Sequence, residues 1–165
     1  MHTPNGTPIS FRPIASDDTH RLAHAFDQLS PTSRYRRFLA PVKSLSEEQL
    51  HRLTHVDFVD HTAWVAELID EPGRPLAGVG RWIRSKTDPT VAEIALTVVD
   101  AYQGQGLGTA LLRLLAESAL PAGVHWFEAN VLGENQPMRG LLRRFGARQV
   151  GFDMGAYVFR LPVPI

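Results

Sequence analysis

The feature that most constrains this chain is a glycine-rich turn placed between an apolar segment and an amphipathic one. The apolar run 91–99 leads into the turn Gln103-Gly104-Gln105-Gly106-Leu107-Gly108, and residues 107–120 follow with helical spacing. Glycine adopts positive φ without strain and lets a ligand approach the backbone closely. The first turn of a helix carries unpaired N–H groups and the positive end of the helix dipole. The pattern therefore predicts a strand, a turn and a helix that together bind a phosphate or pyrophosphate.

The composition is that of one globular domain covering residues 1–165, with 44% hydrophobic and 21% charged residues. Seventeen basic and seventeen acidic residues balance, so we expect neither nucleic acid nor an anionic membrane as a partner. Because the chain has no cysteine, disulfides, thiolate nucleophiles and cysteine-bound metals are excluded, and a cytoplasmic location is expected. No apolar run approaches the roughly 18 residues of a membrane span, and no signal peptide is expected.

Hydrophobic periodicity and capping signals predict the other elements, whose order is typical of α/β or α+β folds. Ser30-Pro31 is typical of a helix start, and Ser46 with Gln49 forms a capping-box pattern. Helices are expected at residues 17–29 (capped by Ser16), 32–39, 47–54, 107–120 and 135–145, the last ended by Gly146. Strands are expected at residues 9–14, 61–69, 76–85, 91–99, 124–132, 147–150 and 156–161.

These elements resemble the GNAT-type N-acetyltransferases over roughly residues 9–161. The cofactor motif of that family is Gln/Arg-x-x-Gly-x-Gly/Ala, which Gln103, Gly106 and Gly108 match in order. The segments 29–38 and Ala92-Glu93-Ile94-Ala95 further resemble bacterial protein-lysine acetyltransferase (Pat-like) domains. The resemblance implies a GNAT-like α/β (α+β) fold, with a mixed, mainly antiparallel sheet of six to seven strands and about four helices.

The resemblance also implies acetyl-CoA as the cofactor. In the family, backbone groups of the strand before the turn contact the pantetheine arm, and the turn binds the pyrophosphate. An asparagine after the following strand contacts the pantetheine arm or its loop, although Asn135 could equally serve only as a helix cap. The implied cofactor-binding residues are Leu96, Thr97, Val98, Gln103, Gly104, Gln105, Gly106, Leu107, Gly108, Thr109 and Asn135. No metal site is expected, because the seven histidines form no metal-ligand pattern.

Three other interpretations of the glycine turn compete with this one. A P-loop requires a lysine before Ser/Thr, which Gly108-Thr109 lacks. A dinucleotide-binding turn requires G-x-G-x-x-G, whereas this sequence has G-x-G-x-G and a long segment before it. Glu128, 20 residues past Gly108, would be the ribose-binding acid of such a site. A turn without ligand would place three glycines at a helix entry with no gain in packing.

Acetyl transfer to an amine requires the free base, and a lysine amine has a pKa of about 10.4. Deprotonation at pH 7 therefore costs on the order of 4 kcal/mol, which a positioned general base helps to offset. Glu93 is the candidate, because it interrupts an otherwise apolar strand, and the family resemblance implies the same catalytic residue. The competing interpretation of Glu93 is a structural ion pair with Arg81 or Arg84 on the neighbouring strand.

The family chemistry also requires a proton donor to the leaving thiolate. Many members of the family carry a tyrosine seven residues after the position of Asn135, where this sequence has Leu142. Tyr102 and Tyr157 are the other candidates for this general acid.

The sequence thus predicts an acetyl-CoA-dependent N-acetyltransferase in which a primary amine, that of a protein lysine or of a small molecule, attacks the thioester directly. The alternatives are an acetyltransferase specific for small-molecule amines and a non-catalytic acyl-CoA-binding sensor domain. We expect a monomer or a homodimer. The cluster Arg34, Arg36 and Arg37 is either a solvated helix face or part of the substrate or cofactor rim.

Overall fold

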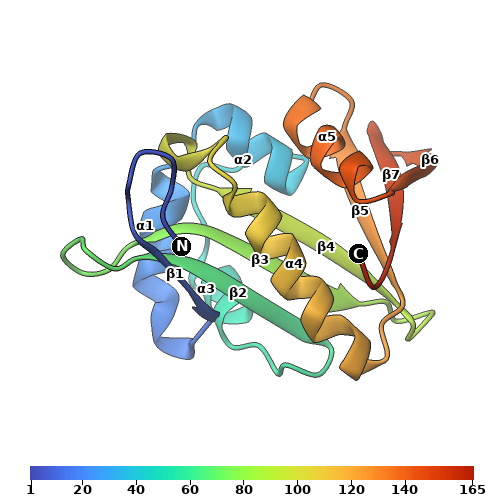
Figure 1. The fold of residues 1–165 in the computed structure, drawn as a ribbon, viewed down its shortest axis with the longest axis horizontal. Helices are drawn as coiled ribbons and strands as arrows, with labels where there is room; N and C mark the ends of the chain where they lie inside the picture. The colour runs from blue at the N-terminus through green and yellow to red at the C-terminus, as the bar shows by residue number, and fades with distance from the viewer.

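The computed structural model describes all 165 residues, which form one seven-stranded sheet with helices on both faces (Figure 1). Helix α4 (Leu107–Ala119) crosses one face, and α5 (Gln136–Arg144) packs on the same side. Helices α1 (Thr19–Asp27), α2 (Pro31–Phe38) and α3 (Glu47–Thr54) lie on the opposite face. The strands are β1 (Ile9–Pro13), β2 (His61–Leu68), β3 (Leu76–Arg84), β4 (Val91–Val98), β5 (Trp126–Leu132), β6 (Arg148–Asp153) and β7 (Ala156–Pro162).

The sheet order is β1-β2-β3-β4-β5-β7-β6, and every neighbouring pair is antiparallel except β4 and β5. The parallel ladder joins only residues 91–93 to residues 126–128, so these two strands separate beyond Glu93. The predicted mixed, mainly antiparallel sheet is confirmed, with seven strands. Five α-helices are present, at the five places that capping and periodicity predicted, whereas the family resemblance implied about four.

Local capping signals are confirmed where the sequence predicted them. Ser30 Oγ accepts a hydrogen bond from the Ser33 N–H at 3.1 Å, with Pro31 at the first position of α2. Ser46 and Gln49 exchange side-chain-to-backbone bonds of 3.1 and 2.8 Å at the start of α3. These helix starts are specified by residues within one turn of each other, which explains why the sequence pattern predicts them.

Several predicted boundaries are wrong by two or three residues, and two of these differences have a local cause. Residues Ser16–Asp18 form a 3-10 turn, so α1 begins at Thr19 and Ser16 does not cap it. The reason is Asp18, whose carboxylate accepts the Ala15 N–H at 2.8 Å and turns the chain before the helix starts. The strand predicted at residues 147–150 extends to Asp153, because its hairpin with β7 closes at residues 154–155, both of which have positive φ.

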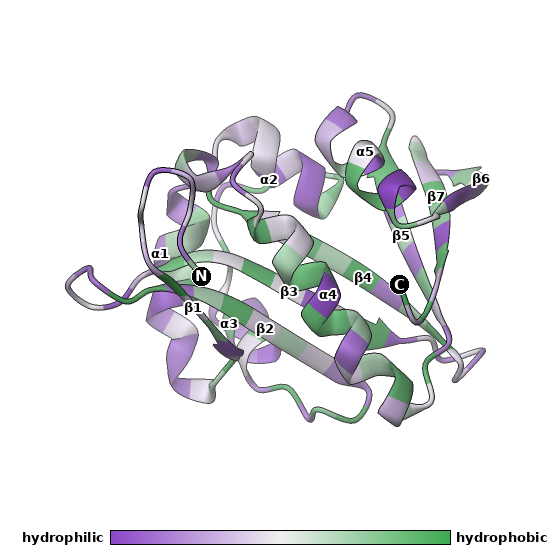
Figure 2. Ribbon diagram, in the orientation of Figure 1, coloured by the Kyte–Doolittle hydropathy of each residue, from purple (hydrophilic) through white to green (hydrophobic).

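Close packing of α4 on the sheet depends on glycine in β3. A Cβ at Gly80 would meet Leu96 Cδ2 at 3.0 Å, and both Leu111 Cβ and Leu115 Cδ1 at 3.2 Å. The leucines of α4 are therefore seated directly against the strand and are fully buried. Apolar residues run along the central strands, whereas α2 and α5 are more hydrophilic (Figure 2). None of the helices has both the length and the apolar character needed to cross a bilayer.

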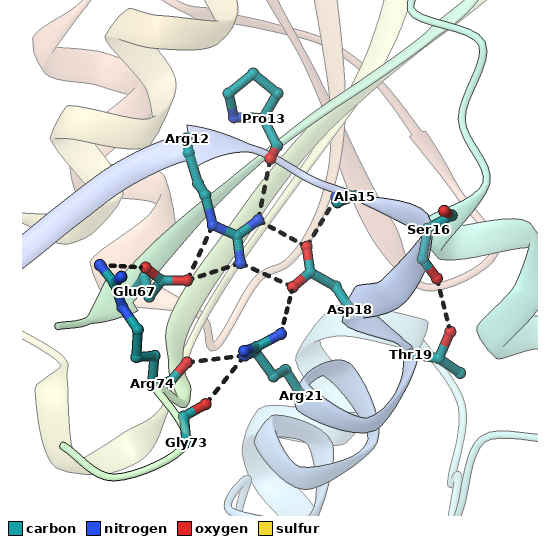
Figure 3. Close-up of polar contacts among 10 residues, drawn as sticks. All are labelled: Arg12, Pro13, Ala15, Ser16, Asp18, Thr19, Arg21, Glu67, Gly73 and Arg74. Atoms are coloured by element: carbon teal, nitrogen blue, oxygen red, sulfur yellow. Dashed lines mark hydrogen bonds and ion pairs between the residues drawn. The ribbon is translucent and has the colours of Figure 1, made fainter.

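An ion-pair network attaches the start of α1 to β1 and to the β2–β3 hairpin (Figure 3). Asp18, with 0% of its surface exposed, accepts hydrogen bonds from Arg12 Nη1 and Nη2, each at 2.8 Å. Arg12 also donates to the buried Glu67, which pairs with Arg74 of the hairpin at 2.9 Å. Burial alone would raise the pKa of Asp18, but the bonds from Arg12 and the Ala15 N–H hold that pKa below its ordinary value.

Asp18→Asn is expected to lower the unfolding free energy by about 2–4 kcal/mol at pH 7, because it removes one carboxylate from a largely buried ion-pair network. Since the pKa of Asp18 is lowered in the folded state, its contribution is complete above the unfolded-state pKa of about 4. It declines as the pH falls through the lower folded-state value. Denaturant titrations at pH 7 and at about pH 3 should therefore show a smaller difference between variant and wild type at the lower pH.

The exposed neighbour Asp17 provides the control for this measurement. Asp17→Asn should change the unfolding free energy by less than about 0.5 kcal/mol at either pH. A loss for Asp18→Asn that is equal at the two pH values would contradict the electrostatic role of this carboxylate.

Candidate active site

Strands β4 and β5 separate beyond their short ladder (Figure 1). A cleft of about 540 Å³ opens there, with residues of α2 and α5 on its walls. This volume lies within the range of small-molecule and cofactor sites. The cleft runs from the end of the β4–β5 ladder, at Glu93, to the glycine turn and the first residues of α4. Its two ends therefore differ chemically, with a carboxylate at one and bare backbone at the other.

The glycine turn has the conformation that a bound anion requires. Gly104 and Gly106 have φ of +73° and +90°, and Gly106 precedes α4 without any side-chain cap. The backbone N–H groups of residues 104–109 donate to no acceptor within the protein. No atom lies within 4 Å of the position that a Cβ would take at Gly104. These free donors at the start of a 13-residue helix fit a phosphate or pyrophosphate.

The free edge of β4 supplies a second set of unpaired backbone groups. The Val99 N–H donates to the Ala77 C=O of the preceding strand at 2.8 Å. Because pairing alternates along an antiparallel ladder, the N–H and C=O groups of Leu96 and Val98 point the other way, toward the gap beside β5. The Val98 C=O accepts a bond from Gln103 Nε2 at 3.0 Å, whereas no strand pairs with Leu96 on this side. This edge fits an extended ligand that carries amide groups.

The cleft brings together most of the residues predicted for the site. The predicted residues on its lining are Glu93, Leu96, Thr97, Val98, Gln103, Gly104, Gly106, Gly108, Thr109 and Asn135. Asn135 also caps α5, because its Oδ1 accepts the Met138 N–H at 3.2 Å. Two predicted residues do not line the cleft: Leu107 is buried in the core, and Gln105 donates its amide to the Ala101 C=O.

Glu93 projects from β4 where the two strands separate, and its side chain is exposed. Asn130 Nδ2 of β5 donates to Glu93 Oε1 at 3.3 Å. The ion-pair interpretation of Glu93 is wrong, because Arg84 pairs instead with Asp60 at 2.8 Å and Arg81 pairs with no carboxylate. The Glu93 carboxylate is consequently open to a ligand in the cleft.

The arginines of α2 were expected to form either a solvated helix face or part of the rim of the site, and they do not all behave alike. Arg36 and Arg37 line the cleft, whereas Arg34 points away and donates to the Lys43 C=O at 3.0 Å. Arg36 donates to both carboxylate oxygens of Glu134, at 3.2 and 2.8 Å, which joins α2 to the loop between β5 and α5. These bonds raise the pKa of Arg36 and lower that of Glu134.

Gln103 connects the glycine turn to α2. Its Nε2 donates to Ser33 Oγ at 3.2 Å as well as to the Val98 C=O. Asp100 adds to the same junction by accepting the Ser30 N–H at 3.0 Å and Ser33 Oγ at 3.2 Å. Burial would raise the pKa of Asp100, but these bonds outweigh it and hold the pKa below its usual value. The start of α2 is therefore fixed to the end of the cleft at the glycine turn.

Several cleft residues were not predicted from the sequence, among them Asn130, Met138 and Arg144. They lie on β5 and α5, and they reach the cleft because β5 separates from β4. Asn130 alone carried a signal, since it is a polar residue within an apolar strand. Glu128, the candidate ribose-binding acid, pairs with Arg160 at 3.1 Å and does not line the cleft, which disfavours the dinucleotide interpretation.

Neither candidate tyrosine for the general acid reaches the cleft. The Tyr102 hydroxyl donates to Glu71 at 3.2 Å, and burial raises its pKa. Tyr157 packs edge-on against Phe152, with ring centroids 5.3 Å apart. Leu142, at the position of the family's usual tyrosine, is buried in the core.

Comparisons with known proteins agree with this geometry. Residues 25–147 match the acetyltransferase (GNAT) family. Acetyltransferase Pat of Mycolicibacterium smegmatis is 35% identical over 153 residues, which are 93% of this chain and 45% of that protein. An acetyltransferase of Pseudomonas aeruginosa is 29% identical over 142 residues, covering 86% of this chain and 76% of its own length. The crystal structure of the GNAT domain of S. lividans PAT superposes with a TM-score of 0.89 at 32% identity, covering 99% of this chain and 95% of that domain.

This chain therefore spans less than half of the Mycolicibacterium protein, whereas it spans nearly all of the S. lividans domain.

Gln103→Glu is expected to lower the unfolding free energy by about 1–3 kcal/mol, because a carboxylate at this position would face the Val98 carbonyl instead of donating to it. Gln105→Glu is the matched control, since the Gln105 amide makes one local bond at the surface, and its effect should stay below about 0.5 kcal/mol. Urea titrations measure both variants. Equal effects would contradict the role of Gln103 in joining the turn to α2.

Proposed function

The chain belongs to the acetyltransferase (GNAT) family, and we propose that it transfers an acetyl group from acetyl-CoA to the side-chain amine of a protein lysine. The match of residues 25–147 to this family and the 35% identity to acetyltransferase Pat confirm the family that the glycine motif indicated. The proposal is carried by one observation: the exposed Glu93 lies in the same cleft as the free edge of β4 and the unpaired N–H groups of the turn. A lysine acceptor is supported by the resemblance of segments 29–38 and 92–95 to protein-lysine acetyltransferases.

The residues present fit acetyl-CoA, which supplies an activated acetyl thioester when it is bound. The N–H groups of residues 104–109 would hold its pyrophosphate. The N–H and C=O of Leu96 would pair with pantetheine amides, in the manner of an added strand. Met138 and Leu141 provide apolar surface on the wall that α5 contributes.

Glu93 has the geometry of a general base for the acceptor. Asn130 donates to Glu93 Oε1 and so orients the carboxylate, while Oε2 has no partner in the protein. A lysine ammonium that enters the cleft beside β4 would transfer its proton to this carboxylate. The neutral amine that results has the free electron pair that direct attack requires, and no covalent intermediate on the protein is needed.

Thiol release from acetyl-CoA, measured with lysine peptides and with small amines, tests the proposed function. Turnover on lysine peptides supports it. Turnover on small amines alone would assign a small-molecule acetyltransferase instead. Binding of acetyl-CoA by calorimetry without turnover on any amine would indicate an acyl-CoA sensor.

Glu93→Gln should reduce kcat by about 10²–10⁴ at neutral pH, because the amide keeps the shape of the side chain but accepts no proton. Acetyl-CoA affinity should change little, since the N–H groups expected to bind its phosphates lie at the opposite end of the cleft. The deficit should shrink as the pH rises toward the pKa of the amine, about 10.4 for lysine.

Glu128→Gln is the control for this variant, because Glu128 is opposite Glu93 in the β4–β5 register but is bound by Arg160. Its kcat should fall by no more than a few-fold. If Glu93→Gln kept nearly full activity at neutral pH, Glu93 would not be the general base.

Gly106→Ala should weaken acetyl-CoA binding by roughly tenfold or more, because a Cβ interferes with charge-assisted hydrogen bonds worth about 1.5–3 kcal/mol each. Gly123→Ala is matched in backbone strain, with φ of +81° against +90°, but it lies after α4 and outside the cleft. Calorimetry of acetyl-CoA binding to both folded variants separates the two effects, because only Gly106→Ala removes space for the ligand whereas both variants add backbone strain. If Gly106→Ala and Gly123→Ala bound acetyl-CoA with equal affinity, the pyrophosphate would not lie at the glycine turn.

A further inference from the structure

Arg81 of β3 is a buried cation beside the candidate active site that has no anionic partner. It is 3% exposed, and its Nη1 donates to the Leu53 C=O at 3.0 Å and to His61 Nε2 at 2.9 Å. No carboxylate oxygen lies within 4.0 Å of it. Burial, reinforced by the charge of Arg81, lowers the pKa of His61 to about 4, so His61 is neutral at pH 7. The guanidinium charge is thus solvated by neutral groups only.

Arg37 of α2 is a second cation of the same kind. It is half-buried, makes no hydrogen bond or ion pair, and stacks on the Phe38 ring at 4.7 Å from the centroid. Burial lowers the pKa of Arg37, and the charge of Glu93 opposes this effect. Burial together with the charge of Arg37 lowers the pKa of Arg81 to about 9. Two guanidinium groups therefore repel each other, with Glu93 as the one carboxylate near enough to act on Arg37.

Both arginines line a small cavity of about 40 Å³ between the sheet and helices α1 to α3. Its other walls are mainly apolar and include Phe26 and Leu53. Arg37 also lines the large cleft, so it stands between the two spaces. A cavity of this size accepts one or two water-sized groups. Unpaired cations in apolar surroundings are unfavourable, and an anion in this space would neutralise them.

The cavity lies close to the expected position of the reacting amine. Arg81 is opposite Ala95 in the β3–β4 ladder, and Glu93 is two residues further along the same face of β4. Diagonal neighbours on such a ladder are about 7–8 Å apart. An anion held by the two arginines would therefore be a few covalent bonds from an amine at Glu93.

We propose that Arg37 and Arg81 bind a carboxylate group of the acceptor, which is thus recognised by its amine at Glu93 and by an acid group a few bonds away. This inference rests on the acetyl transfer to an amine in the proposed function, not on the protein nature of the acceptor, and it narrows the class of acceptor. The planar guanidinium fork matches a carboxylate at two points. A carboxylate is also easier to desolvate in an apolar cavity than a doubly charged phosphate. Its source is either a free amino acid or an acidic side chain next to the lysine of a peptide.

Propionate binding to the protein without acyl-CoA tests the carboxylate site separately from turnover. At constant ionic strength, propionate should raise the thermal unfolding midpoint relative to chloride, and neutral propionamide should not. Arg37→Met should abolish this shift while keeping or raising the midpoint without ligand, because it relieves the repulsion between the half-buried Arg37 and the buried Arg81. Arg148→Gln removes an exposed arginine of β6 and should keep the full shift.

Acceptor comparisons with acetyl-CoA then identify the source of the carboxylate. KM should be roughly 10- to 100-fold lower for lysine than for lysinamide if a free amino acid is the acceptor. The same preference for an Asp-Lys over an Asn-Lys peptide would assign an acidic neighbour in a protein. In either case Arg37→Met should remove the preference, and Arg148→Gln should retain it.

The absence of a propionate shift in the wild type, or a shift that survives in Arg37→Met, would overturn the inference. A preference for succinyl-CoA over butyryl-CoA that depends on Arg37 would place the carboxylate on the acyl donor and overturn its assignment to the acceptor. Failure of thiol release with every amine would refute the proposed function alone, since a propionate shift would still support a carboxylate site.

Discussion

The separation of β4 from β5 is the constraint on which the rest of the site depends. The parallel ladder ends at Glu93 and Glu128, so a strand in the middle of the sheet carries unpaired N–H and C=O groups beyond that point. Buried backbone groups need hydrogen-bond partners, and here a ligand can supply them. The same separation exposes the Glu93 carboxylate and leaves the glycine turn at the other end of the cleft. One interruption in regular strand pairing thus creates the binding edge and positions the candidate base.

The helices pack on both faces of the sheet through apolar residues, and polar bonds are added on the face of α1 to α3. Helix α4 is seated on β3 through close contacts at Gly80, which fixes the helix that begins at the glycine turn. On the opposite face, α1 and α3 pack through the apolar residues Leu22, Ala25 and Leu53. Polar bonds also hold α1 through Asp18 (Figure 3) and α2 through Gln103 and Arg36. A hydrogen bond contributes about 0.5–1.5 kcal/mol, whereas burial of a leucine contributes about 1.5–3 kcal/mol. Apolar packing therefore contributes most on both faces, and the polar bonds fix where α1 and α2 lie.

Sequence patterns predicted the parts of this protein that depend on neighbouring residues. The glycine turn and the Ser30-Pro31 helix start involve residues a few positions apart, and both have the expected local conformation. Glu93 was identified from a charge within an apolar strand and from the family resemblance, and its catalytic role stays a prediction. Contacts between distant segments were not predictable. Arg36 and Glu134 are 98 residues apart, and periodicity indicates which face a residue occupies but not which helix covers that face.

The part of β4 that β5 does not pair with has a consequence for solubility. Beyond Glu93, β4 is a sheet edge inside the molecule, and unpaired edges are templates for association with other chains. Here the bond between Arg36 and Glu134 joins the two walls of the cleft, which restricts access by a foreign strand while leaving room for a slender ligand. At the periphery, β6 exposes Val150 and Phe152, but the register shift between Gln149 and Gly151 interrupts its ladder with β7. Such an irregular edge is a poorer template for an added strand than a regular one.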